Sequence, residues 1–369
     1  MATGGITQLD EDVLTEILLR LPSKSVLRAR AVSKQWRHIA TRPCFVAAYS
    51  VRRPPEIIVF YELDQDGNPV PDNKTIDGKY RQAVGAINFA AQEEDLVRRP
   101  IVHYPGGTLH LHAFCDGLLL FCRGDERLFI FIPATRQVTF LPSLPITSPR
   151  ASVQPVGFYR HRASGEYRVL CHVEQIHYIL SAGAGAGEPR RLADSIAFPT
   201  FPGVALHGSL HWLICAEKSS DPDMILAFDT VLDKFRRMAP PLVPAAGSSC
   251  YRAPHLFEMH GMLAASAVRD VPHMDVWVLQ DYNRESWAWH LRITIPQVRT
   301  MFGSPFKATA LGVLEGNVLV VQYGGLVISY HMDGERKLHV LDTRTADSSA
   351  LCHQGIYRES LVSLTLAPP

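Results

Sequence analysis

The chain has 369 residues, of which 47% are hydrophobic and 20% charged, so it has enough apolar material for a full globular core. This composition excludes wholesale disorder. Lys and Arg number 37 against 36 Asp and Glu, and the resulting net charge of +1 gives no overall field that would attract nucleic acid or an anionic membrane. The 26 Pro and 25 Gly residues indicate many turns, as in an all-β chain.

The sequence contains no run that approaches the roughly 20 apolar residues of a membrane-spanning helix, and residues 1–8 lack the apolar core of a signal peptide. We therefore expect a cytoplasmic or nuclear protein with no membrane partner. Seven cysteines, an odd number scattered along the chain, favour reduced thiols over a disulfide framework.

Residues 1–50 predict three short helices. Apolar residues at helical spacing mark the first helix, and acidic residues precede them, where the helix dipole favours carboxylates. Pro22 ends this helix, and Ser33 can cap a third helix over 34–40. Three short helices bury little surface, so this unit should lean on a partner or a neighbour. The stripe of the first helix comprises Val13, Leu14, Ile17, Leu18 and Leu21.

After residue 50 the apolar period changes to two, and from residue 111 a repeat can be counted. Each unit holds two hairpins. The second hairpins start 48, 49, 50 and 52 residues apart, near Leu128, Ile176, Ile225, Asp275 and Val327. The first hairpins turn around Gly117, Gly165, Gly208, Gly261 and Gly316. Four strands in about 50 residues are typical of a kelch-like propeller blade.

These patterns predict an α+β multidomain chain. A small three-helix domain should occupy 1–50, a linker with the first propeller strands 51–110, and the rest of an all-β propeller of about six four-stranded blades 111–369. The sixth blade would combine strands at 57–61 and near Ile101 with a carboxy-terminal strand, Leu361 to Leu366. Pairing the first and last strands would close the ring and remove both exposed edges.

The amino-terminal residues carry a family resemblance. Glu16-Ile17-Leu18, Arg20-Leu21-Pro22, Val32-Ser33-Lys34 and Trp36-Arg37 resemble the F-box motif, and the match runs from Leu9 to about Phe45. The remainder is similar to the F-box-associated domain of the large plant families, which is a kelch-like β-propeller. The matching segments are Phe114-Cys115-Asp116-Gly117-Leu118-Leu119, Gly208-Ser209-Leu210-His211-Trp212-Leu213 and Ile225-Leu226-Ala227-Phe228-Asp229.

This resemblance implies the substrate-recognition subunit of an SCF-type E3 ubiquitin ligase, which is not itself an enzyme. The F-box would dock on a Skp-family adaptor and, through it, a cullin, while the propeller would bind an unknown target protein for ubiquitin-dependent degradation. Some of the apolar residues expected at the adaptor must instead hold the three helices together. The expected adaptor-binding residues are Leu9, Leu14, Ile17, Leu18, Leu21, Pro22, Leu27, Val32 and Trp36.

Two other classes of binding protein stay open at this point. Residues 1–50 carry 7 basic and 4 acidic side chains, and three short helices could form a DNA-binding helix-turn-helix, although the leucine-rich face favours a protein groove. A propeller could also bind a carbohydrate, a small ligand or nucleic acid without any link to a ligase. The basic residues concerned are Arg20, Lys24, Arg28, Arg30, Lys34, Arg37 and Arg42.

Signals for an enzyme are weaker. The Gly/Ala run at 183–187 follows a strand but lacks the helix of a dinucleotide site, so it indicates a hairpin tip. His110 and His112 share a strand face, but Cys115 should point the other way, which disfavours a metal site with Asp116. No G-x-S-x-G elbow occurs. We therefore predict no catalytic residue, no cofactor, no metal and no nucleic-acid partner.

Overall fold

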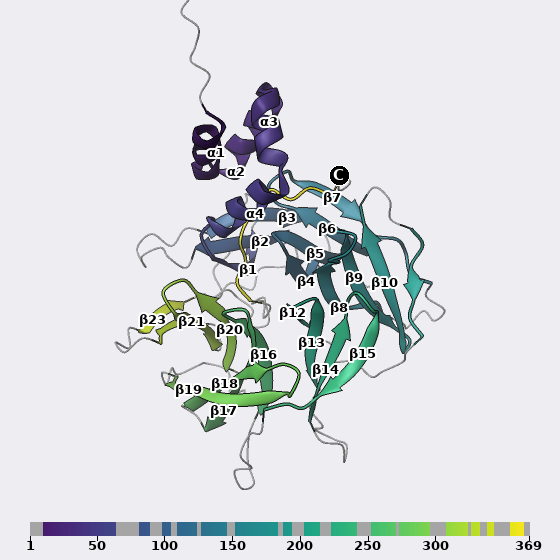
Figure 1. The fold of residues 1–369 in the computed structure, drawn as a ribbon, viewed down its shortest axis with the longest axis vertical. Helices are drawn as coiled ribbons and strands as arrows, with labels where there is room; N and C mark the ends of the chain where they lie inside the picture. The colour runs from purple at the N-terminus through teal and green to yellow at the C-terminus, as the bar shows by residue number, and fades with distance from the viewer. Residues whose placement is uncertain are drawn as a thin grey trace, which may run out of the picture.

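The computed structural model describes residues 10–63, 81–88, 98–104, 109–123, 127–145, 152–183, 187–193, 203–214, 223–241, 252–270, 273–295, 308–323, 326–332, 338–342 and 355–364. Within these residues four short helices come first, and every later element is a β-strand. The strands form six sheets arranged around a ring, with the helices beside it (Figure 1). The predicted fold class, a helical unit followed by a six-bladed propeller, is confirmed.

The helices are short because capping and breaking residues delimit them. Asp10 precedes the first helix and accepts a hydrogen bond from the amide of Glu11 at 2.7 Å, and Pro22 follows its end. Ser33 caps the third helix by accepting a hydrogen bond from the amide of Trp36 at 3.4 Å. The helices are α1 (Glu11–Arg20), α2 (Ser23–Val32), α3 (Lys34–Thr41) and α4 (Pro43–Val51).

The fourth helix, α4, adds to the three that the sequence predicts. Its first residue is Pro43. Proline suits this position because the N–H groups of the first turn have no partner within the helix, so the N–H that proline lacks costs no hydrogen bond. Phe45 and Tyr49, four residues apart, are both buried, and their rings stack with centroids 6.0 Å apart. Most other residues of α4 are apolar too, so the segment lacks the contrast between a polar and an apolar face that reveals a helix in a sequence.

Blades 1 to 5 are antiparallel sheets in which four strands pair in chain order, whereas blade 6 is a three-stranded sheet from the start of the propeller. Blade 1 comprises β4 (Leu109–Cys115), β5 (Leu118–Arg123), β6 (Arg127–Ile132) and β7 (Gln137–Phe140), and blade 2 comprises β8 (Gln154–Arg160), β9 (Tyr167–Val173), β10 (Ile176–Ala182) and β11 (Arg190–Arg191). Blade 3 comprises β12 (Val204–Leu206), β13 (Ser209–Ile214), β14 (Met224–Asp229) and β15 (Lys234–Met238), and blade 4 comprises β16 (Arg252–Met259), β17 (Met262–Asp270), β18 (His273–Asp281) and β19 (Ser286–Thr294). Blade 5 comprises β20 (Ala308–Leu314), β21 (Val318–Tyr323), β22 (Leu326–His331) and β23 (Leu338–Asp342), and blade 6 comprises β1 (Glu56–Leu63), β2 (Arg81–Asn88) and β3 (Arg98–Tyr104).

The tight turns between the first two strands of the blades lie where the sequence places them. In blade 1 the turn residues are Asp116 and Gly117, whose φ angles of 48° and 78° are both positive. Two central residues with positive φ are the requirement of a type I′ turn, which matches the twist of the flanking strands. Blade 4 repeats this arrangement at His260 and Gly261, with φ angles of 49° and 76°.

The apolar core of the propeller is divided among its blade interfaces. Each of the six pairs of neighbouring blades encloses its own cluster of buried residues. Ile58 of blade 6 packs in one cluster with Phe121 of blade 1, and Ile57 packs in another with Leu311 of blade 5. Because blade 6 is packed on both of its faces, the ring is closed.

The carboxy-terminal segment completes blade 6 at Tyr357. The backbones of Glu56 in β1 and Tyr357 exchange two hydrogen bonds of 2.8 Å. Gly355 lies against the innermost strands of both neighbouring blades, because a Cβ there would meet the carbonyl of Leu311 at 3.2 Å and the ring of Phe114 at 4.0 Å. The end of the chain thus occupies the innermost place of the sixth blade.

The predicted closing strand, Leu361 to Leu366, was wrong in its position. Of that range the structure describes 361–364, which form no strand, and Leu361 packs among the helices instead. The alternating apolar residues of this segment suit a strand that needs a cover on one face. Alternation does not tell whether a neighbouring blade or a helical unit supplies that cover.

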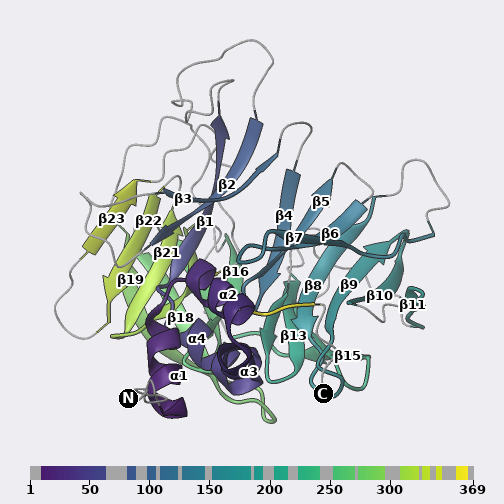
Figure 2. The ribbon, with the colours of Figure 1, turned by 90° about the horizontal axis from the view of Figure 1, so that it is seen from above.

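The helical unit lies beside blades 6 and 1 (Figure 2). Its buried cluster includes Leu361 from the carboxy-terminal segment, and Ala134 from the β6–β7 turn packs against it. Because strands alternate in direction within a blade, the turns after the first and third strands lie on one rim. The helices contact the propeller at this rim, which we call the helix-side rim.

Candidate functional site

The helical unit buries part of the stripe that the sequence assigns to the adaptor. Leu14 and Leu18 of α1 are 5% and 1% exposed, and they pack with Val26 of α2 and Ile39 of α3. Their place is in the core of the unit. Three more of the predicted adaptor residues are partly buried against this cluster, namely Leu21, Leu27 and Trp36.

Other predicted residues remain at the surface. Ile17 is 42% exposed and Val32 is 78% exposed, and Pro22 is also exposed. Val13, which belongs to the same stripe but was not predicted to bind the adaptor, is 47% exposed. Val13 and Ile17 are four residues apart and so share one face of α1. Leu9 lies outside the described residues.

Ion pairs connect acidic side chains of α1 to arginines at both ends of α4. The guanidinium of Arg42, next to the first residue of α4, pairs with the carboxylate of Glu11. Glu16 accepts hydrogen bonds from Arg52 at 2.8 Å and from Arg20 at 3.0 Å, and these bonds lower the pKa of its carboxyl group. Such exposed pairs contribute little stability individually, but together they orient α1.

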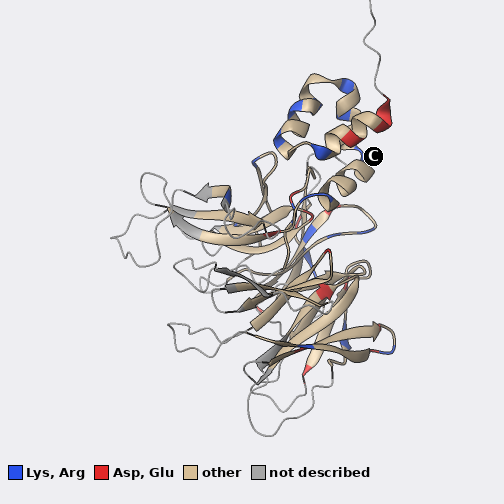
Figure 3. Ribbon diagram, turned by 90° about the vertical axis from the view of Figure 1, so that its left-hand side faces the viewer, with Lys and Arg blue, Asp and Glu red and all other residues tan. Residues whose placement is uncertain are grey.

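Several basic residues of the helix-turn-helix alternative are engaged within the unit. Arg30 donates to the carbonyl of Ala40, and Arg37 donates to the carbonyl of Arg30 at 2.8 Å, which ties α2 to α3. With Arg20 and Arg42, four of the seven basic residues have a partner in the unit. Lys and Arg are spread over the helices and not gathered along one of them (Figure 3). This distribution does not form the basic stripe that DNA recognition needs.

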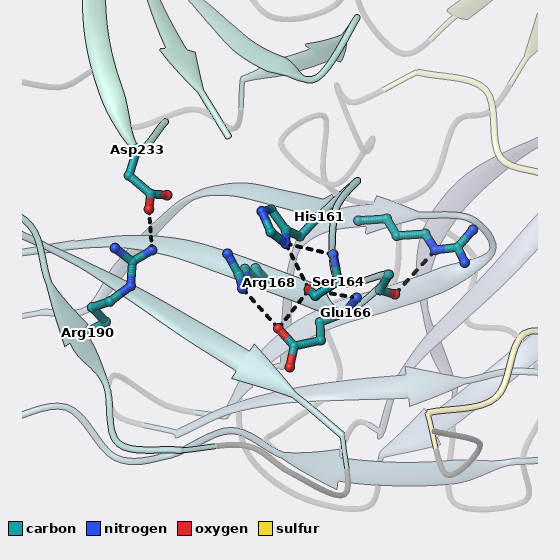
Figure 4. A network of polar contacts seen from close by, with 8 residues as sticks. His161, Ser164, Glu166, Arg168, Arg190 and Asp233 are labelled. Carbon is teal, nitrogen blue, oxygen red and sulfur yellow. Dashed lines mark hydrogen bonds and ion pairs between the residues drawn. The ribbon is translucent and has the colours of Figure 1, made fainter. Parts of the chain in front are cut away.

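The helix-side rim carries a polar network in the β8–β9 turn of blade 2 (Figure 4). The Ser164 hydroxyl lies 2.8 Å from Nδ1 of His161 and donates to the carboxylate of Glu166 at 2.9 Å. Arg168 donates to the same carboxylate at 3.0 Å, and these two bonds lower the pKa of Glu166. In a catalytic triad the acid orients the histidine, whereas here it binds the serine and the arginine. These contacts therefore stabilise the conformation of the turn.

Polar contacts also join neighbouring blades on this rim. Arg190 of blade 2 pairs with Asp233 of blade 3 at 2.6 Å (Figure 4). His211 of blade 3 lies 2.7 Å from the hydroxyl of Tyr282 in blade 4. Its other ring nitrogen, 3.2 Å from the carbonyl of Val204, must carry the proton, because a carbonyl only accepts. Burial lowers the pKa of His211 to about 4, so the ring is neutral at pH 7.

No metal site emerges from the described residues, where no group of three or more His, Cys, Asp or Glu side chains is placed to hold an ion. Burial lowers the pKa of His112 to about 4 and raises that of the Cys115 thiol, so both groups are neutral at pH 7. Residues 184–186, within the glycine- and alanine-rich run, lie outside the described part. No helix of that part is long and apolar enough to cross a membrane.

Comparisons with known proteins place both regions of the chain. The family model described as "F-box domain" matches residues 6–47, and the model described as "F-box associated beta propeller domain" matches residues 88–332. An F-box/kelch-repeat protein of Arabidopsis thaliana is 22% identical over 345 residues, which cover 88% of each chain. The F-box protein CPR1 of the same plant is 23% identical over 310 residues, 75% of this chain and 70% of the relative.

Among solved structures, apo AztD from Citrobacter koseri matches 82% of this chain and 97% of its own at 11% identity, with a TM-score of 0.40. A likeness at that level says nothing about function. The family match, in contrast, spans most of the propeller and agrees with the blades described above. The chain therefore belongs to the family of F-box proteins with an F-box-associated β-propeller domain.

Proposed function

We propose that this protein is the substrate-recognition subunit of an SCF-type ubiquitin ligase, in which the F-box binds a Skp-family adaptor, and through it a cullin, and the propeller binds the target. F-box proteins of this architecture are in general substrate adaptors without catalytic activity of their own. The observation that carries the proposal is the exposed apolar face of α1, because its own chain leaves Val13 and Ile17 about half uncovered. We also propose that it works in the cytoplasm or nucleus.

The exposures divide the described residues among the predicted adaptor residues into three groups. Ile17, Pro22 and Val32, with Val13 added, are available to a partner, whereas Leu14 and Leu18 hold the helices together. Leu21, Leu27 and Trp36 form the third group: they are partly buried, and a partner could cover their exposed parts. Complete burial of an aliphatic side chain contributes about 1.5 to 3 kcal/mol before the costs of association. Several half-exposed side chains could therefore support a stable complex.

The test is capture of the full-length chain by a purified Skp-family adaptor. The double variant Val13→Asp, Ile17→Asp places charges on the exposed face of α1 and should weaken capture about tenfold or more, because each carboxylate would lose water in the interface. Leu18 is unsuitable for this test, since a charge at a fully buried position would unfold the unit.

Val138→Asp is the matched control. Val138, in β7, is 47% exposed, like Val13, but belongs to the propeller. This control should be captured as well as the wild type. Equal capture of the double variant and the wild type would contradict the proposal and favour a propeller that binds its ligand without a ligase.

A further inference from the structure

The segment 355–364, which we call the C-terminal strap, enters three separate buried clusters within ten residues. Tyr357 is fully buried between blades 6 and 1, Leu361 is 2% exposed in the helical cluster, and Leu364 packs between blades 1 and 2. A segment that served ring closure alone would need only the first of these contacts. The strap continues beyond the ring and joins it to the helices.

Polar contacts bind the strap to the end of α4. The guanidinium of Arg358 donates to the carbonyl of Val51, the last residue of α4, at 3.2 Å and also to the carbonyl of Arg53. Carbonyls at the end of a helix have no partner within it, and a cation there also matches the helix dipole. Arg358 therefore holds the connection from the F-box to the propeller at the point where it leaves the helix.

An ion pair anchors the strap to blade 6. Arg99 of β3 binds the carboxylate of Glu56 with two of its nitrogens and lies 3.5 Å from the carboxylate of Glu359. The Glu56 side chain is 7% exposed, which holds Arg99 in place within blade 6, and the Glu359 side chain of the strap is 17% exposed beside it. The strap is thus held on the propeller immediately before it reaches the helices.

Few other contacts of this kind join the two units. Among the described residues, the propeller and the strap contribute only Leu361 and Ala134 to the helical cluster, and Ala134 is small and partly buried. The direct connection, residues 52–55, is short and has no apolar side chain in that cluster. The connection is itself tied to the helices, since Arg53 donates to the carbonyls of Leu19 at 2.8 Å and Leu21 at 3.3 Å. Leu361 and Arg358 join the strap to this assembly, Leu361 within the helical cluster and Arg358 at the carbonyls of Val51 and Arg53.

We propose that the C-terminal strap is a positioning device that fixes the orientation of the F-box on the propeller. On the function proposed above, it would set the direction in which a bound target faces the ligase. Different residues of one segment then serve two purposes: Tyr357 closes the ring, and Leu361 and Arg358 hold the F-box on the propeller. Loss of Leu361 or Arg358 should release the helices from the ring while the ring stays closed.

Limited proteolysis of the full-length chain tests this assignment. Trypsin can cut between Arg52 and Arg53, next to the carbonyl that Arg358 binds. The single variants Leu361→Ala and Arg358→Ala should each accelerate this cut at least tenfold, since local opening controls the rate at which a protected site is cleaved. The unfolding of the propeller, followed by Trp fluorescence, should stay a single cooperative transition in both.

Leu263→Ala serves as the matched control. Leu263 is 1% exposed in the cluster between blades 3 and 4, away from the helices. Its loss should lower propeller stability and leave the cut after Arg52 unchanged at temperatures well below melting. The proposal is overturned if neither strap variant cleaves faster than the wild type, or if Leu263→Ala cleaves as fast as they do.

The proteolysis needs no adaptor, so its result is independent of the proposed function. Both strap variants should still be captured by a Skp-family adaptor, because neither touches the exposed face of α1. Faster cleavage with no capture of the wild-type chain would support the strap and overturn the proposed function. Unchanged cleavage with normal capture would overturn the proposal for the strap and support the proposed function.

Discussion

At the scale of single residues, two turn glycines with the same backbone conformation differ in the space available for a side chain. Gly117 and Gly261 have almost the same φ, 78° and 76°, and both follow a residue with positive φ. A Cβ at Gly117 would lie 2.6 Å from the Cβ of Ser360 and 2.9 Å from the carbonyl of Arg358. A Cβ at Gly261 would meet nothing within 4 Å. The strap explains the difference.

We predict that Gly117→Ala destabilises the protein more than Gly261→Ala does. The left-handed backbone should cost about 1 to 2 kcal/mol for alanine at either site. At Gly117 the collision with the strap should add about 1 to 3 kcal/mol. Chemical unfolding of the two variants measures the difference directly, and equal free energies of unfolding would mean that the strap yields to the added methyl group.

His211 predicts a loss of stability in mild acid. Its pKa is lowered from the ordinary 6.5 to about 4 by burial, so between these values the unfolded chain binds a proton that the folded chain does not. Stability should therefore fall as the pH drops through this window, and between pH 7 and 5 the contribution of His211 is about 2 kcal/mol. His112 should act in the same direction.

Urea unfolding of the wild type and His211→Gln at pH 7 and at pH 5 checks this prediction. The variant should lose less stability between the two pH values, although it should start from a lower value because the hydroxyl of Tyr282 loses its partner. Tyr282→Phe, which keeps the histidine, is the control and should retain the acid sensitivity. An equal loss in all three proteins would point to other groups.

At the scale of elements, α1 shows that a wide apolar stripe can serve two purposes. Adjacent residues of the stripe have opposite environments, since Ile17 is 42% exposed and Leu18 is 1% exposed. We predict that Leu18→Ala lowers the stability of the helical unit by about 2 to 5 kcal/mol, whereas Ile17→Ala costs less than about 1 kcal/mol. Hydrogen exchange of α1 and α3 would measure both, and similar losses would contradict the assignment of Ile17 to the surface.

The sequence was sufficient for the periodic elements and insufficient where an element depends on a distant neighbour. The period of 3.6 residues located α1, and glycine turns located the first hairpins of the blades. The apolar stripe of α1 is too wide to tell Ile17 from Leu18, because the division depends on where α2 and α3 pack. The polar network of Ser164 and Glu166 was missed because its side chains meet only through the geometry of a turn.

At the scale of the whole molecule, the repeat predicts a ring, while the residue that closes the ring depends on contacts between the two ends of the chain. Apolar residues alternate with polar ones from 362 to 366, whereas residues around Tyr357 have little alternation to mark an inner strand. Tyr357 is nevertheless fully buried, and its ring packs edge-on against Phe114 with centroids 5.8 Å apart. Closure at blade 6 therefore combines the packing of both faces of the blade with one aromatic side chain and one backbone pair from the end of the chain.

We predict that Tyr357→Ala opens the ring locally at blade 6. The substitution removes the contact with Phe114 and the hydrogen bond to the carbonyl of Gly117, and it leaves a cavity that should cost about 3 to 5 kcal/mol. Hydrogen exchange should accelerate in β1 and β4, which flank the closure, and remain slow in β13 and β14 of blade 3 across the ring. Tyr357→Phe keeps the ring and loses only a 3.3 Å hydrogen bond, so it should exchange nearly as the wild type does. Equal acceleration in every blade would instead mean that the propeller opens as one unit, and that its closing residue stabilises all the blades alike.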